Sequence, residues 1–588
     1  MRAFSMAIVM LNAHSLFAAT WYVRPDGGTR YSTNVKTGQC DGKADSAYPG
    51  SGTNRHCAFN DVRFLWSDAS YTYGKEFPGW GWIGTGGDTY LIRGTIENKV
   101  SYRVGANSRT KYCDSTGCWG VAGYTWGSGA PPPPSGTPES HTRILGENYA
   151  SCRTASAKTR LQGGWNLGAV LNLDGASYVD VACLDITDFS ACGRAAQKLK
   201  CDESGDWAAN GIAFSNQSTH DTVTDVRIHG MASNGIMGPT GDGVVLDHVD
   251  LVGNAGSGWD ADPGNGTTGK GSLLVHNFNI SWNGCAEEYP VTEQLPYSDC
   301  TDQEAGGYGD GFGTTTKDSD PPGWQVQFDQ GTVSYNTQDG LDALHIGGTG
   351  SSMTVTHVLA FGNMGQQIKV GGATATITDS VIVGNCRALS EKIPGTPPGY
   401  NARLSIFCRA GDTAVVISVP DAQPAVFQRN VIYSANQIAL EIAYPGDPGP
   451  KAAIHYDNNV FLGFKNQRGE YPTPIYGDTD LKMFTNPGSS FSHNTTFHAN
   501  RSWECPAKAL HETDASCEDP HLKDETWHPY GYPDTNPGAT ATGRSGGQTS
   551  DTAVSKTSAI AWGAMGGAVL ITLGWKGFGL VRGRGAAD

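Results

Sequence analysis

The sequence has few charged residues, and most of these are acidic. Charged residues make up 17% of the chain, against roughly 25% in typical soluble domains. The 41 lysines and arginines are outnumbered by 57 aspartates and glutamates, so the net charge is −16. A nucleic-acid binder needs a Lys- and Arg-rich surface to neutralise phosphates, so this composition excludes nucleic acid as a partner. An acidic partner would need a bridging cation or a local basic pocket.

Two further patterns are missing from the sequence. The cysteines and histidines show none of the spacings that are typical of zinc sites. The chain also lacks amphipathic helical patterns long enough to connect the parallel strands of a doubly wound sheet. These absences exclude a zinc-binding protein and favour a body made of strands and turns.

Glycine and cysteine are abundant. The 79 glycines are about twice the usual share. The 14 cysteines fit an oxidising compartment. They fall into neighbouring pairs, which we interpret as local disulfide staples: Cys40/Cys57, Cys113/Cys118, Cys152/Cys183, Cys192/Cys201, Cys285/Cys300, Cys386/Cys408 and Cys505/Cys517.

The two ends of the chain carry targeting signals. Residues 1–19 combine Arg2, an apolar stretch and Ala18-Ala19, which is the pattern of a signal peptide. The apolar run from Ala559 to Trp575 predicts a transmembrane helix over residues 557–582. The basic residues that follow should remain cytoplasmic. We therefore expect an exported protein anchored in the membrane at the cell surface, although a removable sorting tail is an alternative.

Repeats carry the prediction of the fold. Five segments end on a common asparagine and have an apolar residue three places earlier. The asparagines recur mostly every 22 to 29 residues, with one double gap that contains Cys285 and Cys300. In stacked coils these residues would form an asparagine column and an apolar column. The asparagines are Asn254, Asn283, Asn336, Asn363 and Asn385, and the apolar residues are Leu251, Ile280, Val333, Ala360 and Ile382.

We therefore predict an all-β protein built as a single-stranded right-handed parallel β-helix. Residues 20–84 should form an irregular N-terminal cap region, 85–500 the β-helix, and 501–556 a disulfide-stapled tail and flexible stalk before the transmembrane helix. A β-sandwich is the main alternative, but it does not require both columns at this period.

The repeat also places polar residues close together. Six positions after their asparagines stand Asp260, Asp342 and Lys369. Because stacked strands lie ~4.8 Å apart, Asp342 and Lys369 should be neighbours on adjacent coils. If the two Asp-Gly segments stack, Asp310 should lie beside Asp339. Asp339 and Asp342 can share one site only if the chain bends between them, for example at Gly340.

Such a cluster suggests a specific chemistry. Clustered carboxylates favour a bound cation, and oxygen ligands suit Ca²⁺. A bound Ca²⁺ could hold the carboxylate of a uronic-acid sugar and acidify the proton on C5. A neutral lysine nearby could then remove that proton, and β-elimination would cleave the polysaccharide.

The stretch from Gly307 to Gly372 resembles the calcium-dependent pectate lyases of polysaccharide lyase family nine. The resemblance rests on an Asp-Gly-Phe motif at 310–312, an Asn-x-x-Asp-Gly-x-Asp motif at 336–342 and a Lys-x-Gly-Gly motif at 369–372. It implies a β-helix, with the four calcium aspartates of the family at Asp310, Gln338, Asp339 and Asp342 and its lysine base at Lys369. Gln338 departs from the family and should weaken metal binding. The match covers about 65 of 588 residues.

Other interpretations remain open. Asp-Gly pairs suit any tight corner, so the cluster could be a structural calcium site or a set of unliganded polar turns. A polygalacturonase-type hydrolase is less consistent with the motifs, since no Gly-His-Gly lies between them. A non-enzymatic, glycan-binding surface protein is a third possibility. Candidate substrate-binding residues are Trp259, for stacking a sugar, and Arg387, Arg403 and Arg409, for binding substrate carboxylates.

Overall fold

The computed structural model describes a large part of the chain, all of it within one compact unit, Met1–Thr542. The described residues are 18–66, 81–97, 113–114, 117–118, 131–155, 158–163, 168–188, 208–231, 233–262, 268–286, 299–300, 309–315, 323–346, 350–372, 374–385, 388–389, 413–419, 424–443, 452–465, 469–477 and 486–520.

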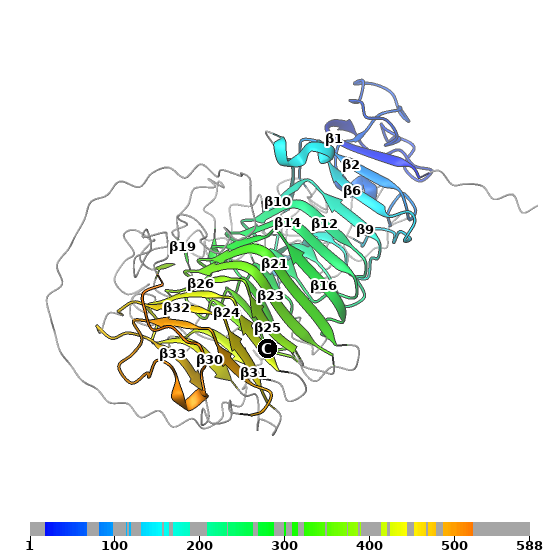
Figure 1. Ribbon diagram of the computed structural model, residues 1–588. Coiled ribbons are helices and arrows are strands. Elements are labelled where there is room, and N and C mark those ends of the chain that lie inside the picture. Colours follow the sequence, from blue (N-terminus) through cyan, green and yellow to red (C-terminus); the bar gives the residue numbers. More distant parts are fainter. Residues whose placement is uncertain are drawn as a thin grey trace, which may run out of the picture. The chain divides into compact units, whose positions relative to one another are not determined.

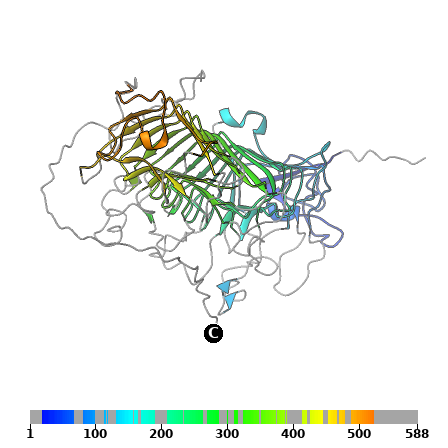
Figure 2. The same cartoon turned by 60° about the horizontal axis from the view of Figure 1, so that its bottom comes forward.

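Parallel strands make up almost all of the regular structure (Figures 1 and 2). One sheet has 21 strands: β1 (Thr20–Gly28), β2 (Thr89–Ile92), β3 (Thr95–Glu97), β6 (Thr142–Gly146), β7 (Thr159–Gly163), β9 (Val179–Ala182), β10 (Leu184–Asp188), β12 (Thr222–His229), β14 (Val244–Val252), β16 (Gly271–His276), β17 (Asn279–Ser281), β21 (Trp324–Ser334), β23 (Ser352–Phe361), β25 (Thr374–Thr378), β26 (Val381–Gly384), β28 (Ala425–Gln428), β29 (Val431–Ser434), β31 (Ile454–Asp457), β32 (Val460–Gly463), β34 (Ser490–Ser492) and β35 (Thr495–Phe497).

A second parallel sheet has ten strands: β8 (Ala169–Asn172), β11 (Asn210–Ala213), β13 (Ile236–Met237), β15 (Trp259–Asp260), β20 (Phe312–Thr315), β22 (Leu341–His345), β24 (Ile368–Val370), β27 (Thr413–Ser418), β30 (Ile438–Ala443) and β33 (Thr473–Gly477). Two short antiparallel pairs join β4 (Cys113–Asp114) to β5 (Gly117–Cys118) and β18 (Cys285–Ala286) to β19 (Asp299–Cys300). The described residues also include the 3₁₀ helices Val62–Leu65, Tyr149–Thr154 and Lys508–Leu510.

Each coil bends within the large sheet at one residue. In β14 this residue is His248, whose φ is 56°; Leu246 before it and Val249 after it are both buried. The equivalent residues in other coils also have left-handed backbone, with φ between 51° and 60°. Asn, Asp and His tolerate this conformation better than most residues, which explains why they recur at the bend: Asp225, Asn277, His357, Asp379, Asn458 and His493.

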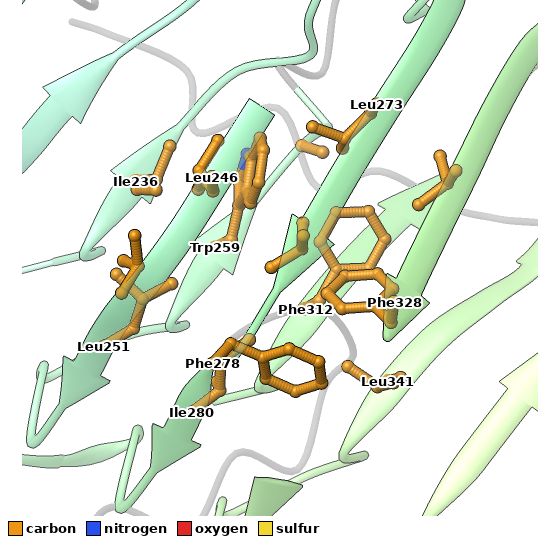
Figure 3. Packing of buried hydrophobic residues seen from close by; sticks show 14 of the residues in the cluster. Ile236, Leu246, Leu251, Trp259, Leu273, Phe278, Ile280, Phe312, Phe328 and Leu341 are labelled. Carbon is orange, nitrogen blue, oxygen red and sulfur yellow. The ribbon is translucent and has the colours of Figure 1, made fainter. Parts of the chain in front are cut away.

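The predicted apolar column is confirmed. Leu251 pairs with Ile280, Ile280 with Val333, Val333 with Ala360 and Ala360 with Ile382, and all five side chains are buried. The ten-stranded sheet contributes an opposite inner column that includes Trp259, Phe312, Leu341 and Ile368. Figure 3 shows part of these two columns packing against each other. The parallel β-helix of the predicted fold class is therefore what the described residues form.

The asparagine ladder is also present, with one difference. Asn254 Nδ2 donates to Asn283 Oδ1 at 2.9 Å, Asn283 Nδ2 to Asn336 Oδ1 at 2.8 Å, and Asn336 Nδ2 to Asn363 Oδ1 at 2.8 Å. Asn363 Nδ2 then donates to Gln367 Oε1 at 2.8 Å. Gln367 therefore takes the place that we had predicted for Asn385.

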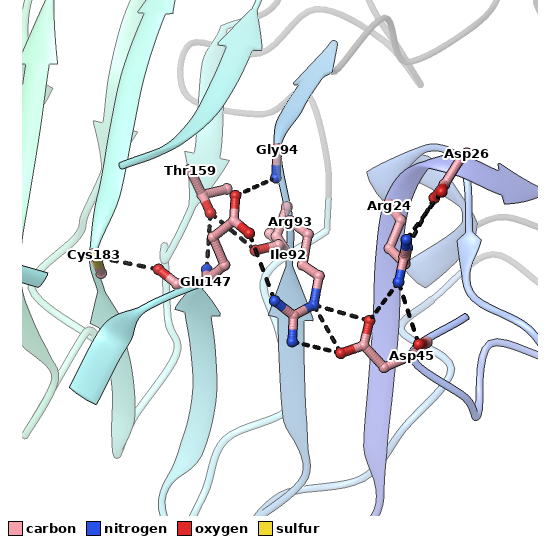
Figure 4. Close-up of polar contacts among 9 residues, drawn as sticks. All are labelled: Arg24, Asp26, Asp45, Ile92, Arg93, Gly94, Glu147, Thr159 and Cys183. Atoms are coloured by element: carbon pink, nitrogen blue, oxygen red, sulfur yellow. Dashed lines mark hydrogen bonds and ion pairs between the residues drawn. The ribbon is translucent and has the colours of Figure 1, made fainter. Parts of the chain in front are cut away.

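The N-terminal coil begins earlier than the predicted boundary at residue 85, because β1 pairs in parallel with β2. Irregular chain follows β1, and ion pairs connect it to the first coils (Figure 4). Arg93 Nε lies 2.8 Å from Asp45 Oδ2, and Arg24 Nη1 lies 3.2 Å from Asp45 Oδ1. The backbone N–H of Gly94 donates to Glu147 Oε1 at 2.9 Å, which links β2–β3 to the end of β6. These polar contacts attach the irregular segment to the edge of the sheet.

Three of the seven predicted disulfides are observed: Cys40–Cys57, Cys152–Cys183 and Cys505–Cys517. Cys285 is also disulfide-bonded, and it lies directly opposite Cys300 in the β18–β19 pair. Cys113 and Cys118 face each other in β4–β5. The remaining pairs, Cys192/Cys201 and Cys386/Cys408, lie outside the described residues.

The C-terminal transmembrane helix of the predicted fold class is corrected. In the part of the chain that the structure describes, no helix is long and apolar enough to cross a membrane. Residues 557–582 themselves, like residues 1–17 of the predicted signal peptide, lie outside the described residues. The sequence offers a reason: the run is shorter than the ~20 residues that a spanning helix needs. Several glycines within it also disfavour a helix by about 1 kcal/mol each: Gly563, Gly566, Gly567 and Gly574.

We predict that Asn336→Ala lowers the free energy of unfolding by about 1–3 kcal/mol, because it leaves the buried amide groups of Asn283 without their acceptor. Asn385→Ala is the matched control, since Asn385 Nδ2 has no hydrogen-bond partner among the described residues. Denaturant unfolding of both variants measures the difference. Equal losses would mean that the ladder does not stabilise the coils.

A second prediction concerns Asp221, which is completely buried. Its Oδ1 accepts the backbone N–H of Val179 at 2.9 Å. Burial raises the pKa of Asp221 to about 8. The folded chain therefore keeps this proton while the unfolded chain loses it near pH 4, so the group costs stability increasingly between about pH 4 and pH 8. Asp221→Asn, which cannot ionise, should match the wild-type melting temperature at pH 4 and exceed it at pH 8. An equal difference at both pH values would contradict the buried neutral carboxyl.

Candidate functional site

The outer face of the ten-stranded sheet carries one column of residues in register. In each strand the residue that precedes the member of this column points into the core; these inward residues include Trp259, Phe312, Leu341 and Ile368. Strand alternation then turns the next residue outward. From the N-terminal coils onward the outward column contains Asn172, Ala213, Met237, Asp260, Gly313, Asp342, Lys369, Val416, Glu441 and Tyr476.

Lys369 joins two carboxylates at the centre of this column. Its Nζ lies 2.9 Å from Oδ2 of Asp342, its register partner on the adjacent strand. It lies 2.7 Å from Oδ2 of Asp339, which precedes β22 in the turn. The predicted neighbours therefore do meet, and the chain bends between Asp339 and Asp342. Only 15% of the Lys369 side chain is exposed, so the ammonium is held at the outer face but is reachable from solvent.

Glycine makes this bend possible. The backbone N–H of Gly340 donates to Gln366 O at 2.9 Å on the next coil, and a Cβ at Gly340 would collide with Gln367 O. The preceding coil repeats the arrangement, with Gly311 N–H donating to Asp339 O at 2.9 Å. Glycine is therefore needed in these turns because successive coils approach each other too closely for any side chain.

A side-chain oxygen before each of these glycines forms a second ladder, which we call the turn ladder. Asn234 Oδ1 accepts Ser257 N–H at 2.9 Å, Asp310 Oδ1 accepts Asp339 N–H at 2.9 Å, and Asp339 Oδ1 accepts Gln366 N–H at 2.7 Å. The same role falls to neutral groups in the earlier coils and to carboxylates only in two of them. In chain order the side-chain acceptors of the turn ladder are Asn210, Asn234, Ser257, Asp310 and Asp339.

Comparing equivalent positions of the turn ladder shows which properties of Asp310 and Asp339 the fold needs and which it does not. An amide oxygen satisfies the buried N–H at Asn234, so the fold needs an acceptor there but not a charge. A buried carboxylate pays for desolvation that an amide avoids. The carboxylates at Asp310 and Asp339 therefore point to a function that uses charge.

Electrostatics within the cluster are unbalanced. Burial raises the pKa of Asp310 well above its usual range, and the charges of Asp339 and Asp342 raise it further. Burial would lower the pKa of Lys369, but the charges and hydrogen bonds of Asp339 and Asp342 outweigh it, so the pKa of this lysine is raised. Three carboxyl groups thus share one ammonium, and that ammonium is held in its protonated form.

Of the four predicted calcium ligands, Asp339 and Asp342 pair with Lys369, and Asp310 accepts the backbone N–H of Asp339. Asp342 Oδ1 accepts Leu344 N–H at 3.1 Å, and Gln338 is buried in the same turn as Asp339. Within the described residues, no three acidic, histidine or cysteine side chains are positioned to hold a metal ion. In donor type the cluster fits a hard cation, since it offers carboxylate and amide oxygens. The charge fits as well: three ionised carboxylates and the ammonium of Lys369 would leave two negative charges, which one divalent cation balances.

Of the four predicted substrate-binding residues, only Trp259 is among the described residues. The prediction that Trp259 stacks on a sugar is wrong: its ring is completely buried against Phe312, with the centroids 5.5 Å apart. Its Nε1 donates to Gly238 O at 2.9 Å, so the large apolar ring fills the core. Arg387, Arg403 and Arg409 lie outside the described residues.

Sequence reasoning missed the turn ladder, although a signal for it exists. A polar residue followed by glycine recurs at Asn210-Gly211, Asn234-Gly235, Ser257-Gly258, Asp310-Gly311 and Asp339-Gly340. The prediction used only the two Asp-Gly pairs. The complete series shows that the glycine is needed by the fold in each of these coils, and that only the change from an amide or hydroxyl to a carboxylate points to a site.

Comparisons with known proteins find likeness at the level of structure. No protein-family model matches the chain, and no curated protein matches its sequence. Pectate lyase Pel9A is 12% identical, with a TM-score of 0.33 over 80% of this chain and 81% of its own. The A-module of the Azotobacter vinelandii mannuronan C-5 epimerase AlgE4 is 13% identical, with a TM-score of 0.38 over 69% and 91%. A mannuronic-acid-specific family 6 polysaccharide lyase from human gut microbiota is 11% identical, with a TM-score of 0.35 over 76% and 88%. All three TM-scores lie below 0.5, so the function has to follow from the residues of this chain.

We predict that Asp310→Asn keeps the hydrogen bond from Asp339 N–H and removes a carboxyl group whose pKa the fold raises, so its free energy of unfolding at neutral pH should equal or exceed that of the wild type. Asp310→Ala, which loses the acceptor, should be about 1–3 kcal/mol less stable. Denaturant unfolding compares the three proteins. If the asparagine variant is as unstable as the alanine variant, the charge at 310 has a structural role.

Proposed function

We propose that this chain is a polysaccharide lyase that cleaves an acidic, uronate-containing glycan by β-elimination, with Lys369 as the base. One observation carries the proposal: a lysine between two carboxylates, on the outer face of the sheet, next to a third carboxyl that the fold does not require to be charged. A lysine and an excess of acidic groups therefore lie together at one accessible point, which supports the proposal.

The lysine must lose its proton before it can act. Paired with Asp339 and Asp342, its amine stays protonated and cannot accept a proton. Any cation that competes for these carboxylates would weaken both pairs and lower the pKa of Lys369. The neutral amine could then take the C5 proton of the sugar. The electrons of the C5–H bond would form a double bond between C4 and C5 as the bond from C4 to the glycosidic oxygen breaks, and that oxygen takes up a proton.

Ca²⁺ is the cation we propose, and Asp310, Asp339 and Asp342, with the amide oxygen of Gln338, would hold it. Bound there, it would supply the positive charge that attracts the uronate carboxylate and acidifies the C5 proton. Gln338 contributes no charge, so we expect weaker binding than four carboxylates would give. The negative charge of the chain as a whole favours such a bridging ion for an acidic substrate.

We also infer that the chain works outside the cytoplasm. The disulfides Cys40–Cys57, Cys152–Cys183 and Cys505–Cys517 are typical of proteins in oxidising compartments. The signal peptide expected over residues 1–19 is consistent with this location.

We predict that the full chain, given polygalacturonate or alginate with Ca²⁺, releases products with the ultraviolet absorbance of an unsaturated uronate. Lys369→Arg should abolish this activity while the two ion pairs are kept, because arginine does not deprotonate in proteins. Activity of the wild type should disappear with a chelator and return with added Ca²⁺, and Asp339→Asn should need a higher Ca²⁺ concentration for any activity that it keeps.

Other outcomes separate the alternatives. New reducing ends without absorbance would indicate a glycoside hydrolase, for which the raised pKa of Asp310 would suit a general acid. Glycan binding without cleavage would indicate a non-enzymatic, glycan-binding protein. Full activity of Lys369→Arg would exclude Lys369 as the base.

A further inference from the structure

The outward column of the ten-stranded sheet is accessible over a limited stretch, which we call the open strip. Met237, Asp260, Gly313, Asp342 and Lys369 are all partly exposed. The column is closed at both ends, since Ala213 on one side is 2% exposed and Val416 on the other is 3% exposed. Five positions separated by four strand steps of ~4.8 Å span about 19 Å. Lys369 therefore stands at one end of a strip that is long enough for several linked sugar residues.

The middle position of the open strip is a glycine, Gly313, so no side chain projects from the strip there. Gly313 pairs with Asp260 on one side and with Asp342 on the other, so no side chain separates these two carboxyl groups. A Cβ at Gly313 would lie 2.8 Å from Asp310 Oδ2. The second carboxyl oxygen of Asp310, Oδ2, therefore lies close to the position that a side chain at residue 313 would occupy.

Asp260 is the charged residue of this strip that the proposed reaction does not use. Its Oδ1 accepts the backbone N–H of Asp262 at 3.1 Å. Burial raises the pKa of Asp260 to about 7; the hydrogen bond from Asp262 N–H opposes this and the charge of Asp262 adds to it. On the neighbouring strands, β13 contributes Met237 and β20 contributes Gly313, and neither side chain is titratable. Asp310 and Asp342 are the nearest acidic groups along the strip.

We propose that Asp260 holds a sugar residue of the glycan by a hydrogen bond in the open strip, several units from the point of cleavage at Lys369. The proposal rests on the proposed function for the position of cleavage at Lys369. Register places Asp260 three strand steps from Lys369, about 14 Å. That separation is too great for Asp260 to take part in proton transfer, so it is a binding residue and not a catalytic one.

The pH dependence follows from the same geometry. With its proton, Asp260 can donate to a sugar hydroxyl or to a uronate carboxylate. Without it, Asp260 repels an anionic chain that also passes the carboxylates of Asp310 and Asp342. Affinity for long acidic oligosaccharides should therefore fall as the pH rises through about 7.

Chain-length dependence tests the proposal. Uronate oligosaccharides from disaccharide to hexasaccharide should be cleaved with rising kcat/KM until the strip is filled. Asp260→Ala should reduce kcat/KM for the longest substrates about three- to tenfold, the effect of one lost hydrogen bond, while the shortest cleaved substrate is unaffected. Glu441→Gln is the matched control: it removes a carboxylate of the same column beyond the buried Val416 and should leave the profile unchanged.

Binding measurements keep the test independent of catalysis. In the Lys369→Arg background, calorimetry with the hexasaccharide should show weaker binding at pH 8 than at pH 6, and Asp260→Asn should remove that difference. If the wild type cleaves nothing but Lys369→Arg binds with this dependence on length and pH, the proposed reaction fails and the strip stands. If cleavage occurs and Asp260→Ala leaves the length profile unchanged, the glycan does not cover Asp260 and the inference is overturned.

Discussion

Every coil of this protein has to satisfy its buried backbone at the corner before the ten-stranded sheet. Unpaired N–H groups at such a corner would each cost the free energy of a lost hydrogen bond. The chain meets the requirement with two ladders of side-chain oxygens. In the asparagine ladder each oxygen accepts a backbone N–H from the preceding coil, and in the turn ladder each oxygen accepts one from the following coil. Glycine follows each residue of the turn ladder up to Asp339, because the next coil is too close for a Cβ.

The site is a local variation of this structural device. Asp310 and Asp339 occupy ladder positions that Asn210, Asn234 and Ser257 fill elsewhere. Their hydrogen bonds hold the carboxyl groups in place at no extra conformational cost, and their second oxygens remain for other work. For Asp339 that work is the contact with Lys369. A charged site can therefore be built into a β-helix with few substitutions, provided that a cation balances the charge.

The sequence was informative where periodicity is enforced by burial. The apolar column from Leu251 to Ile382 could be predicted because an exposed member would cost the transfer of its side chain to water. The meeting of Asp342 and Lys369 followed from that register alone. Trp259 was misassigned because a lone tryptophan fits a core position and a sugar platform equally well, and only packing against Phe312 distinguishes them. Asn385 was misassigned because its neighbour in the ladder, Asn363, is satisfied within its own turn by Gln367, which the repeat alignment does not consider.

Register also explains why Lys369 lies on the outer face of the ten-stranded sheet. Lys369 lies between Ile368 and Val370, which are both completely buried. A slip of one residue in β24 would turn both apolar side chains outward and bury the ammonium away from Asp339 and Asp342. Exposing the two apolar side chains would cost several kcal/mol, and an unpaired charge in the core would cost more. The burial of Ile368 and Val370 in the core therefore determines the position of Lys369, the proposed base, on the outer face.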